Sequence, residues 1–315
     1  MVMHHTTKNL LCGLLAALGG CADPATARLD EAALILPGDA FHPEGLAIDG
    51  DDNLYIGSVG TGEILRVARG DTAPAPFIAA GTGGLTAAVG LAVDEDAGKL
   101  WVCSADATFT RPNALASFEL STGRPVDSFP LPGGVGICND LVRDPRGNLY
   151  VTDSITGRIH RLPARGTALE IWSDAAAFAP RMGGEFTVNG ADYASDSLFV
   201  VKSSTGELFR VPIAATGEAG APIPIPLDRP LHDPDGLKAL DASTLFVVED
   251  GGVTRIALEG DRGTASRIAD GIEQPSGLTL EGGSAWVAEG QIGRLVGFDP
   301  SPKVLPFTLR RVALR

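Results

Sequence analysis

The 315-residue sequence has few of the residues that mark several common classes of protein. It contains only 4 cysteines and 5 histidines, which form no cluster along the chain, and this argues against a structural zinc site. The formal net charge of −14 and the lack of a basic stripe exclude nucleic acid as a partner. No G-x-S-x-G, H-E-x-x-H or P-loop motif is present, which disfavours a serine nucleophile. Beyond the first residues no segment has a sustained 3.6-residue periodicity, so long helices are not expected.

The N-terminal segment is typical of an export signal. Lys8 precedes the apolar run Leu10–Leu18, which is too short to cross a bilayer of about 30 Å as a helix. Because Cys21 directly follows small residues, the pattern resembles a lipoprotein signal at 1–21 in which Cys21 is lipidated, with a tether at 22–30. The alternative is simple secretion with cleavage near Ala22. Both interpretations predict an exported protein, either periplasmic, anchored to a membrane only through its lipid, or secreted.

Two cysteines remain once Cys12 and Cys21 are assigned to this segment. Cys103 and Cys138 fall in neighbouring repeats, near the predicted inner strands. An oxidising compartment permits a disulfide between them. Two buried free thiols are the alternative, and we favour it slightly because free cysteine is often a buried apolar residue.

A six-fold repeat occupies the rest of the chain, 31–315, as one domain. Its opening segments are 45, 50, 50, 46 and 41 residues apart, a period typical of a β-propeller. The six segments, here called anchors, are Pro43–Asp49, Ala88–Asp94, Cys138–Asp144, Val188–Ala194, Pro234–Leu240 and Pro275–Glu281. Each anchor leads into an apolar strand, a polar turn and a second strand such as "LYVTD". The sequence therefore predicts an all-β fold, a six-bladed propeller of four-stranded antiparallel blades.

The last blade raises the question of how the ring closes. Its third strand is expected at "GRLVGFD" (Gly293–Asp299), and its fourth strand could come from Ala32–Gly38 or from Lys303–Leu309. The first of these lies where each blade's fourth strand should precede the next anchor. We therefore expect the N-terminal strand to complete the last blade, which removes a sheet edge.

The second residue of each anchor starts an innermost strand, so these six residues should converge on the propeller axis. Four of them carry oxygen donors, namely Glu44, Asn139, Asn189 and Asp235. Val89 and Ser276 leave two blades without a strong donor. Carboxylate and amide oxygens suit Ca²⁺, although Mg²⁺ or Mn²⁺ could also fit. The pattern predicts one divalent cation at the channel mouth.

These residues resemble those of the senescence marker protein/gluconolactonase (regucalcin-like) family of sugar lactonases. The resemblance covers Phe41 to Asp299, and it implies that Glu44, Asn189 and Asp235 hold one cation, with Asn139 as a further ligand or a substrate contact. It also implies metal-dependent hydrolysis of a small sugar lactone or related ester. In that reaction the cation binds the carbonyl oxygen and stabilises the oxyanion formed by attacking water.

Several residues are candidates for the remaining roles. Asp235 is the first choice as general base, and Asp153 at the end of a second strand is its competitor. His232 and His42 lie beside anchors and could move protons or contact substrate, or they could simply cap loops. Lys202 could bind an anionic substrate if it faces the channel, and otherwise it is a solvated strand end.

Two other functions are compatible with the same pattern. One is a binding propeller with a structural cation and no turnover, and the other is a protein-interaction propeller that uses its rim. Propellers serve all of these functions, so the fold alone does not choose among them. We expect a monomer whose partner is a small-molecule substrate.

Overall fold

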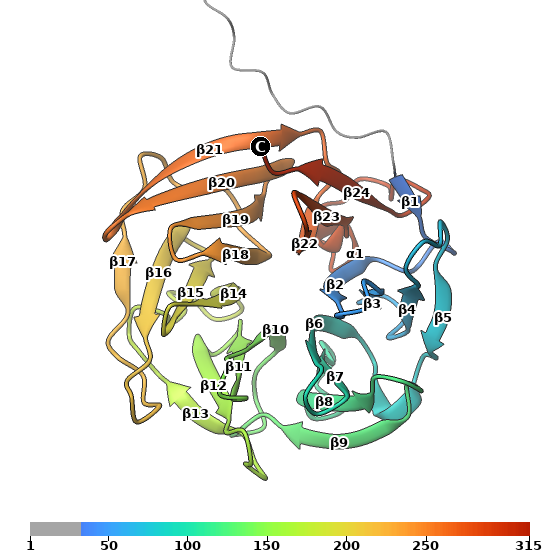
Figure 1. Cartoon of the computed structure of the whole chain (residues 1–315), viewed down its shortest axis with the longest axis horizontal. Coiled ribbons are helices and arrows are strands. Elements are labelled where there is room, and N and C mark those ends of the chain that lie inside the picture. The colour runs from blue at the N-terminus through green and yellow to red at the C-terminus, as the bar shows by residue number, and fades with distance from the viewer. Residues whose placement is uncertain (1–32) are drawn as a thin grey trace, which may run out of the picture.

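Six four-stranded sheets surround a central axis in the computed structural model, which describes residues 33–315 (Figure 1). The first three blades are β2 (Pro43–Ile48), β3 (Leu54–Ser58), β4 (Ile64–Val67) and β5 (Ala75–Ile78); β6 (Ala88–Asp94), β7 (Lys99–Ser104), β8 (Ala114–Glu119) and β9 (Pro125–Pro130); and β10 (Cys138–Arg143), β11 (Leu149–Asp153), β12 (Arg158–Leu162) and β13 (Glu170–Ser173). A 3-10 turn, η1 (Thr82–Gly84), connects the first two blades. The six-bladed propeller predicted from the repeats is confirmed.

The second half of the ring repeats this plan with one change in the last blade. Its blades are β14 (Val188–Ala194), β15 (Ser197–Lys202), β16 (Glu207–Pro212) and β17 (Ile223–Ile225); β18 (Leu237–Asp241), β19 (Thr244–Glu249), β20 (Gly252–Glu259) and β21 (Arg262–Asp270); and β22 (Pro275–Glu281), β23 (Ser284–Glu289), β24 (Thr308–Ala313) and β1 (Ala33–Ile35). The N-terminal strand β1 pairs antiparallel with β24, with Leu34 opposite Leu309. The expected closure by the N-terminal strand is confirmed.

The third strand of the last blade is not where the sequence predicted it. Gly293–Asp299 forms the end of the short helix α1 (Ile292–Leu295) and a loop, and β24 takes the third position instead. Burial explains the choice, because Leu309 and Val312 of β24 are 0% and 1% exposed, whereas Phe298 is 71% exposed. Lys303–Leu309, the other candidate for the outer strand, supplies the beginning of this third strand. The alternating pattern alone did not distinguish the two segments.

The apolar core is divided among six clusters, each lying between two neighbouring blades. The cluster between the last and first blades joins Leu34 and Leu36 to Phe41, Phe307 and Leu309. Each blade therefore stabilises the next, and β1 contributes apolar contacts as well as hydrogen bonds to the closure.

Polar turns connect the inner and second strands at the end of the ring where the inner strands finish. Asp49 accepts hydrogen bonds from the Asn53 backbone (2.8 Å), the Asn53 side chain (2.8 Å) and the Tyr55 hydroxyl (2.9 Å). Asp144, Asn148 and Tyr150 repeat this arrangement in the third blade. The segment Asp49–Asn53 is thus a hairpin turn.

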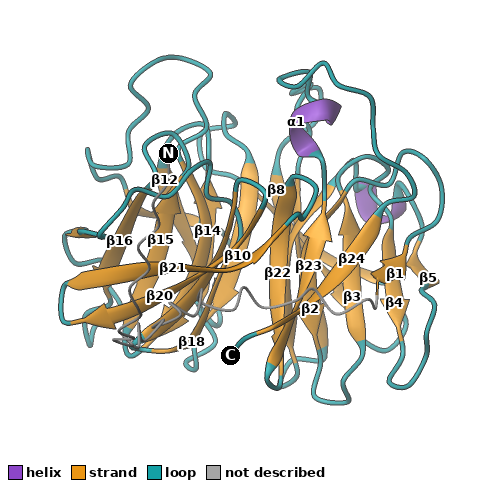
Figure 2. Ribbon diagram, turned by 90° about the horizontal axis from the view of Figure 1, so that it is seen from above, coloured by secondary structure: helices purple, strands orange, loops and turns teal. Residues whose placement is uncertain are grey.

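The longest connections lie at the end of the ring where the inner strands begin (Figure 2). Pro275 pairs with Glu289, so α1 and the connection that follows β23 are at this end. Arg294 braces that connection by ion pairs with Glu273 (2.7 Å) and Asp299 (3.2 Å). Phe298 packs edge-on against Phe186 of the connection between β13 and β14, with ring centroids 6.1 Å apart.

Three predictions concern residues outside the described part of the chain. These are the signal segment 1–21, lipidation of Cys21 and the tether 22–30. Within residues 33–315 no helix is both long and apolar enough to cross a membrane.

Candidate metal and catalytic site

A repeated backbone irregularity includes the second residue of five of the six anchors. Five inner strands change register against their second strands between the first and fourth anchor residues, as between Pro43 and Leu46 of β2. Such a bulge re-aims the side chains that it carries. In the fifth blade β18 begins only at Leu237, and the Asp235 N–H donates to the Val248 carbonyl (2.9 Å) just before it.

Glycine at the third anchor position lets the inner strands approach closely. A side chain at Gly190 would clash with the Asp235 carbonyl, and one at Gly277 would clash with the Glu44 carbonyl. The Gly190 N–H instead donates to the Asp235 carbonyl at 3.0 Å. Close contact between neighbouring inner strands therefore narrows the channel and brings the candidate donors together.

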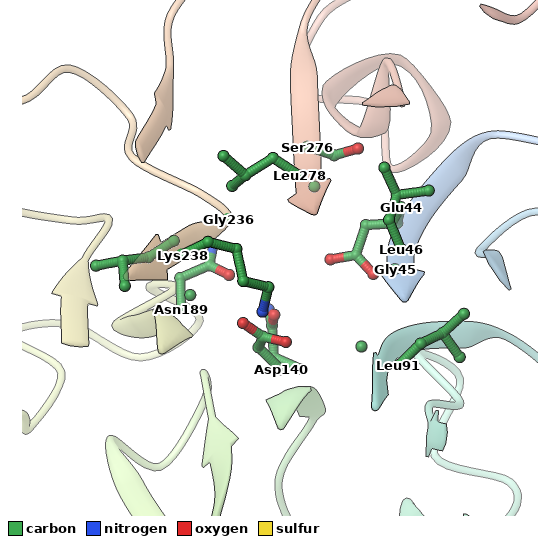
Figure 3. A pocket seen from close by; sticks show the side chains of 15 residues that line it. Glu44, Gly45, Leu46, Leu91, Asp140, Asn189, Gly236, Lys238, Ser276 and Leu278 are labelled. Atoms are coloured by element: carbon green, nitrogen blue, oxygen red, sulfur yellow. The ribbon is translucent and has the colours of Figure 1, made fainter. Parts of the chain in front are cut away.

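The channel contains a small pocket that all six blades line (Figure 3). Glu44 enters it from the first blade, Asn139 and Asp140 from the third, Asn189 from the fourth and Lys238 from the fifth. Three of the four predicted donors are thus side by side. The fourth, Asp235, is half-buried and is not among the residues that line this pocket, but it hydrogen-bonds to Asn189.

Three oxygen atoms at this site are buried without a hydrogen-bond partner. They are Glu44 Oε2, Asn139 Oδ1 and Asn189 Oδ1, and each of the three residues is only 7–8% exposed. Buried polar oxygens without partners are rare in folded proteins and call for a ligand, water or ion. Oxygens of this kind are the donors that Ca²⁺ accepts, so the residues present fit a hard cation.

Neighbouring polar groups orient the Asn189 amide. Its Nδ2 donates to Ser203 Oγ at 2.9 Å, and that hydroxyl donates to the Pro234 carbonyl at 2.6 Å. With the nitrogen occupied on one side, Oδ1 is left free as an acceptor. Ser203 therefore holds the Asn189 amide in one orientation, as hydrogen-bonded neighbours of metal ligands do in known metal sites.

The carboxyl groups at the site disfavour each other's ionisation. Burial raises the pKa of Glu44 well above its usual range, and the charges of Asp235 and Asp140 raise it further, while Lys238 opposes this. Burial and then Asp140 raise the pKa of Asp235 to about 8, although the hydrogen bond from Asn189 lowers it. A cation bound between such carboxylates would stabilise their charged forms.

Within residues 33–315 no group of three or more His, Cys, Asp or Glu side chains is arranged to hold a metal. The candidate donors differ from such a group because two of the four are amides. A cation here would rely on Glu44 and Asp235 for charge and on Asn139 and Asn189 for neutral oxygen donors.

Two pocket residues, Asp140 and Lys238, were missed by the sequence analysis, which considered only the second anchor position. Asp140 occupies the third position, where the other five anchors have glycine. Lys238 occupies the fifth position, which is apolar in three other anchors, Thr279 in the sixth and Asp192 in the fourth. The replacement of glycine by an acid at this position was the signal that could have identified Asp140.

Asp153 is fully buried outside the pocket and fixes a loop. Its carboxylate accepts hydrogen bonds from the Ile137 N–H (3.0 Å) and the Thr156 hydroxyl (2.5 Å), and it faces His160 Nε2 at 3.3 Å. Burial acts to raise the pKa of Asp153, but these hydrogen bonds outweigh it and lower the pKa below its usual value. The carboxylate is thus fully engaged, and a role as base stays an untested prediction.

The three other predicted residues also lie outside the pocket lining. Lys202 is buried, and its ammonium donates to the carbonyls of Ala177 (3.0 Å) and Ala179 (3.2 Å), so it holds a loop and is not a solvated strand end. His42 is buried against Phe307, with Nδ1 2.9 Å from the Gly290 carbonyl, and burial lowers its pKa. His232 is exposed on the loop that leads to Asp235.

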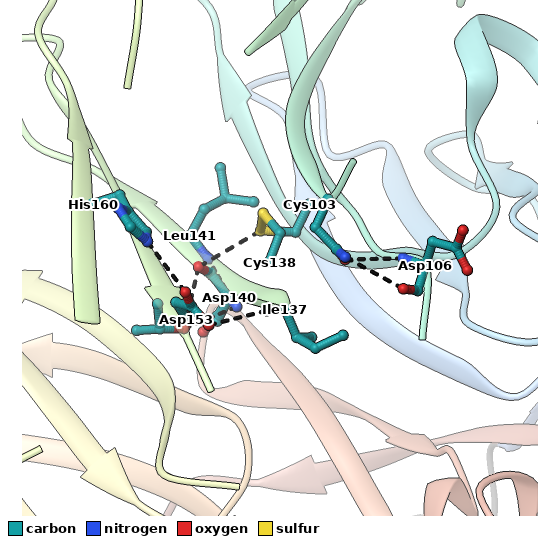
Figure 4. Close-up of a disulfide and its surroundings, with 10 residues drawn as sticks. Cys103, Asp106, Ile137, Cys138, Asp140, Leu141, Asp153 and His160 are labelled. Carbon is teal, nitrogen blue, oxygen red and sulfur yellow. Dashed lines mark hydrogen bonds and ion pairs between the residues drawn. A yellow bond between two sulfur atoms is a disulfide. The ribbon is translucent and has the colours of Figure 1, made fainter. Parts of the chain in front are cut away.

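A disulfide joins Cys103 of β7 to Cys138 of β10 (Figure 4). Our preference for two free thiols was therefore wrong. The inner strand β10 and the second strand β7 of the preceding blade bring the two Cα atoms to 5.1 Å, within bonding range for a disulfide. Since Cys138 directly precedes Asn139 and Asp140, the crosslink also fixes the start of the strand that carries both residues.

Comparisons with known proteins agree with this architecture. A sequence profile for the N-terminal part of strictosidine synthase-like proteins matches residues 25–67. No curated protein matches the chain. Among solved structures, a gluconolactonase from Xanthomonas campestris is similar with a TM-score of 0.66 and 16% identity, covering 93% of this chain and 96% of that one.

Other similar structures have different activities. Virginiamycin B lyase from Staphylococcus aureus has a TM-score of 0.60 and 14% identity, covering 91% of this chain and 99% of that one. The major allergen of Malassezia sympodialis has a TM-score of 0.63 and 13% identity, covering 82% and 89%. Identities this low establish a shared fold and leave the activity open. In fold, then, the chain is a six-bladed β-propeller, similar to these solved structures.

Proposed function

We propose that this protein is a divalent-cation-dependent hydrolase that opens a small sugar lactone or a related ester. The observation that carries the proposal is the set of three buried, unpartnered oxygens, from Glu44, Asn139 and Asn189, beside Asp235 at the propeller axis. The gluconolactonase among the similar structures supports the same reaction class.

A bound cation, which we take to be Ca²⁺, would polarise the ester carbonyl and stabilise negative charge on its oxygen. Glu44, Asn139, Asn189 and Asp235 would hold it. Mg²⁺ or Mn²⁺ would serve if the site adopts their shorter bonds. Glu44 and Asn189 are the second residues of their inner strands, so substrate would approach from the end of the ring where the inner strands begin.

Proton transfer falls to Asp235 in this proposal. It lies beside Asn189 among the other donors, and a bound cation would keep its carboxylate ionised, so it can take the proton from attacking water. His232, exposed on the preceding loop, would pass that proton to solvent. His42 and Lys202 have buried, engaged polar atoms, and we assign them a supporting role around the mouth in place of direct substrate contact.

The test is proton release from a panel of five- and six-membered sugar lactones, with added Ca²⁺ and again with excess chelator. Turnover should require the cation, and Asn189→Ala and Asp235→Asn should each lower kcat/KM by at least about 100-fold. Ser204→Ala is the matched control, because Ser204 is adjacent to Ser203 and does not line the pocket. If folded protein turned over no lactone with the cation bound, the binding-propeller function would replace this one.

We also propose that the protein is exported and acts as a monomer, anchored to a membrane through Cys21 if that residue is lipidated. The Cys103–Cys138 disulfide supports export, since such bonds persist in oxidising compartments. Cell fractionation tests the anchor. The protein should sediment with membranes, and Cys21→Ser should release it. Equal distribution of both forms would favour simple secretion.

A further inference from the structure

Two phenylalanines, here called the aromatic bridge, join blades that are not neighbours in the ring. Phe186 lies in the connection that leads into the fourth blade, and Phe298 lies in the connection between β23 and β24 of the sixth. Their rings meet edge-on with centroids 6.1 Å apart. The fifth blade separates these two blades (Figure 1), and both connections lie at the end where the inner strands begin (Figure 2). The aromatic bridge therefore spans the mouth of the channel.

The aromatic bridge lies close to the candidate metal donors. Phe186 is three residues before Asn189, and a segment of that length spans at most about 11 Å between its end Cα atoms. Thr187 lies between them, is 0% exposed, and donates its backbone N–H to the Ser154 carbonyl (2.8 Å). A molecule bound at Asn189 that extends toward the mouth therefore reaches the aromatic bridge.

The connection that carries Phe298 is fixed, whereas the Phe298 ring is largely free. Gln291 and Val304, near the two ends of the connection, exchange two hydrogen bonds of 2.8 Å each. The Phe298 N–H donates to the Gly293 carbonyl at 2.8 Å, yet Phe298 is 71% exposed. A large apolar side chain in water on a fixed backbone offers a ligand a contact that needs little further ordering.

Other exposed apolar side chains gather on the connections at the same end of the ring. They include Phe109 between β7 and β8, Val135 between β9 and β10, Met182 between β13 and β14, and Leu295 and Val296 beside Phe298. Apolar side chains grouped around the opening of a polar pocket are typical of a small-molecule site whose ligand has both a polar and an apolar part.

We propose that the aromatic bridge determines substrate specificity, and that the substrate is a lactone or ester bearing an apolar alkyl or aryl group. The carbonyl lies at the candidate donors, and the apolar group leaves the channel along the exposed face of Phe298. This inference rests on the proposed function and narrows it, because a lactone bearing only hydroxyl groups would leave the Phe298 ring in water. Contact with the remote group would add binding energy that the lactone ring alone does not supply.

The test is hydrolysis of five-membered lactones that carry a methyl, butyl or octyl group, with Ca²⁺ added. In wild-type protein kcat/KM should rise on the order of tenfold from the methyl to the butyl lactone. Phe298→Ser should remove this rise, and Phe298→Leu should keep part of it. Because Phe298 is mostly exposed, both variants should fold.

Ile171→Ser is the matched control, because it removes an apolar side chain that is 45% exposed on β13, the outermost strand of its blade. It should keep the wild-type preference for the longer chain. Equal kcat/KM for the methyl and butyl lactones in wild type, or the same rise in Phe298→Ser, would overturn the inference.

A binding measurement separates this inference from the proposed function. If folded protein hydrolyses none of the lactones, the proposed reaction fails, and isothermal titration calorimetry then measures the Kd of each intact lactone. A Kd that falls as the chain lengthens in wild type, but not in Phe298→Ser, would still support the aromatic bridge as the specificity determinant. A Kd that is independent of chain length would overturn it.

Discussion

At the scale of single residues, the candidate donors divide into neutral and ionisable groups. Asn139 and Asn189 present amide oxygens whose donor strength does not change between pH 5 and 9. Burial raises the pKa of both Glu44 and Asp235, with Asp235 and Asp140 adding to the rise at Glu44 and Asp140 adding to it at Asp235, so protons compete with any cation for these two groups. The pH dependence of binding therefore comes from the two acids alone.

Calcium binding should weaken steadily as the pH falls from 8 to 6. Burial and the charge of Asp140 raise the pKa of Asp235 to about 8 in the folded, metal-free protein, so the folded state favours the protonated form. The stability that this contributes is present below the unfolded value and is lost as the pH rises through about 8. A bound cation removes that loss, so it should raise the melting temperature more at pH 8.5 than at pH 6.

Thermal melts with and without Ca²⁺ at the two pH values measure this difference. Asp235→Asn provides the control, because an amide does not titrate and the difference should shrink. An equal rise at both pH values would show that the two acids do not share the cation.

The sequence predicted the residues at one position of the repeat and missed those at others. Glu44, Asn139 and Asn189 line the pocket from the second anchor position, whereas Val89 and Asp235 at the same position are not among its lining residues. Asp140 and Lys238 were missed because their positions usually carry glycine or apolar residues, and only the closed ring shows that these positions also meet at the centre. The engagement of Asp153 and Lys202 with loops depends on connections of variable length, which no repeat pattern describes.

At the scale of elements, the acids at the ends of three second strands make the same kind of hydrogen bond to a loop. Asp153, Glu249 and Glu289 each accept a backbone N–H from the loop that leads to the inner strand of the same blade, at Ile137 (3.0 Å), His232 (2.8 Å) and Glu273 (3.1 Å). Each carboxylate thereby fixes the approach of the chain to the channel. A buried acid at this position is explained by that bond without any catalytic role.

Asp153→Asn should lower the free energy of unfolding by about 1–3 kcal/mol, because an amide nitrogen cannot accept the hydrogen bonds that Asp153 receives. Chemical denaturation measures the loss. Affinity for Ca²⁺ should stay within about twofold of wild type, because Asp153 does not line the pocket.

The control is Asp174→Asn, which removes a mostly exposed ion pair with Arg158 and should change stability little. A large loss of lactone hydrolysis in folded Asp153→Asn with no change in stability would instead restore Asp153 as a candidate base.

At the scale of the whole molecule, the ring depends on a contact between the two ends of the chain. Strand β1 is only three residues long, and it completes the last blade against β24. The repeat period predicted both the number of blades and this closure. It did not predict which C-terminal segment β1 would pair with, because the connection after β23 is longer than in the other blades.

Leu34→Ala should destabilise the protein by about 2 kcal/mol, because Leu34 is 8% exposed and packs in the cluster that joins the last blade to the first. Ile35→Ala is a control on the same strand, since Ile35 is 61% exposed, and it should be nearly neutral. Both are measured by chemical denaturation. Equal effects would mean that β1 is held by its backbone hydrogen bonds and not by apolar packing.

The pairing of β1 with β24 also sets the order in which the molecule can be assembled. Ala33 meets Arg310, so β1 cannot reach its place until β24 has been synthesised. Contacts this distant in sequence make folding slow. Until then the last blade has an open edge that can pair with another copy, so aggregation competes with folding most strongly just before the ring closes.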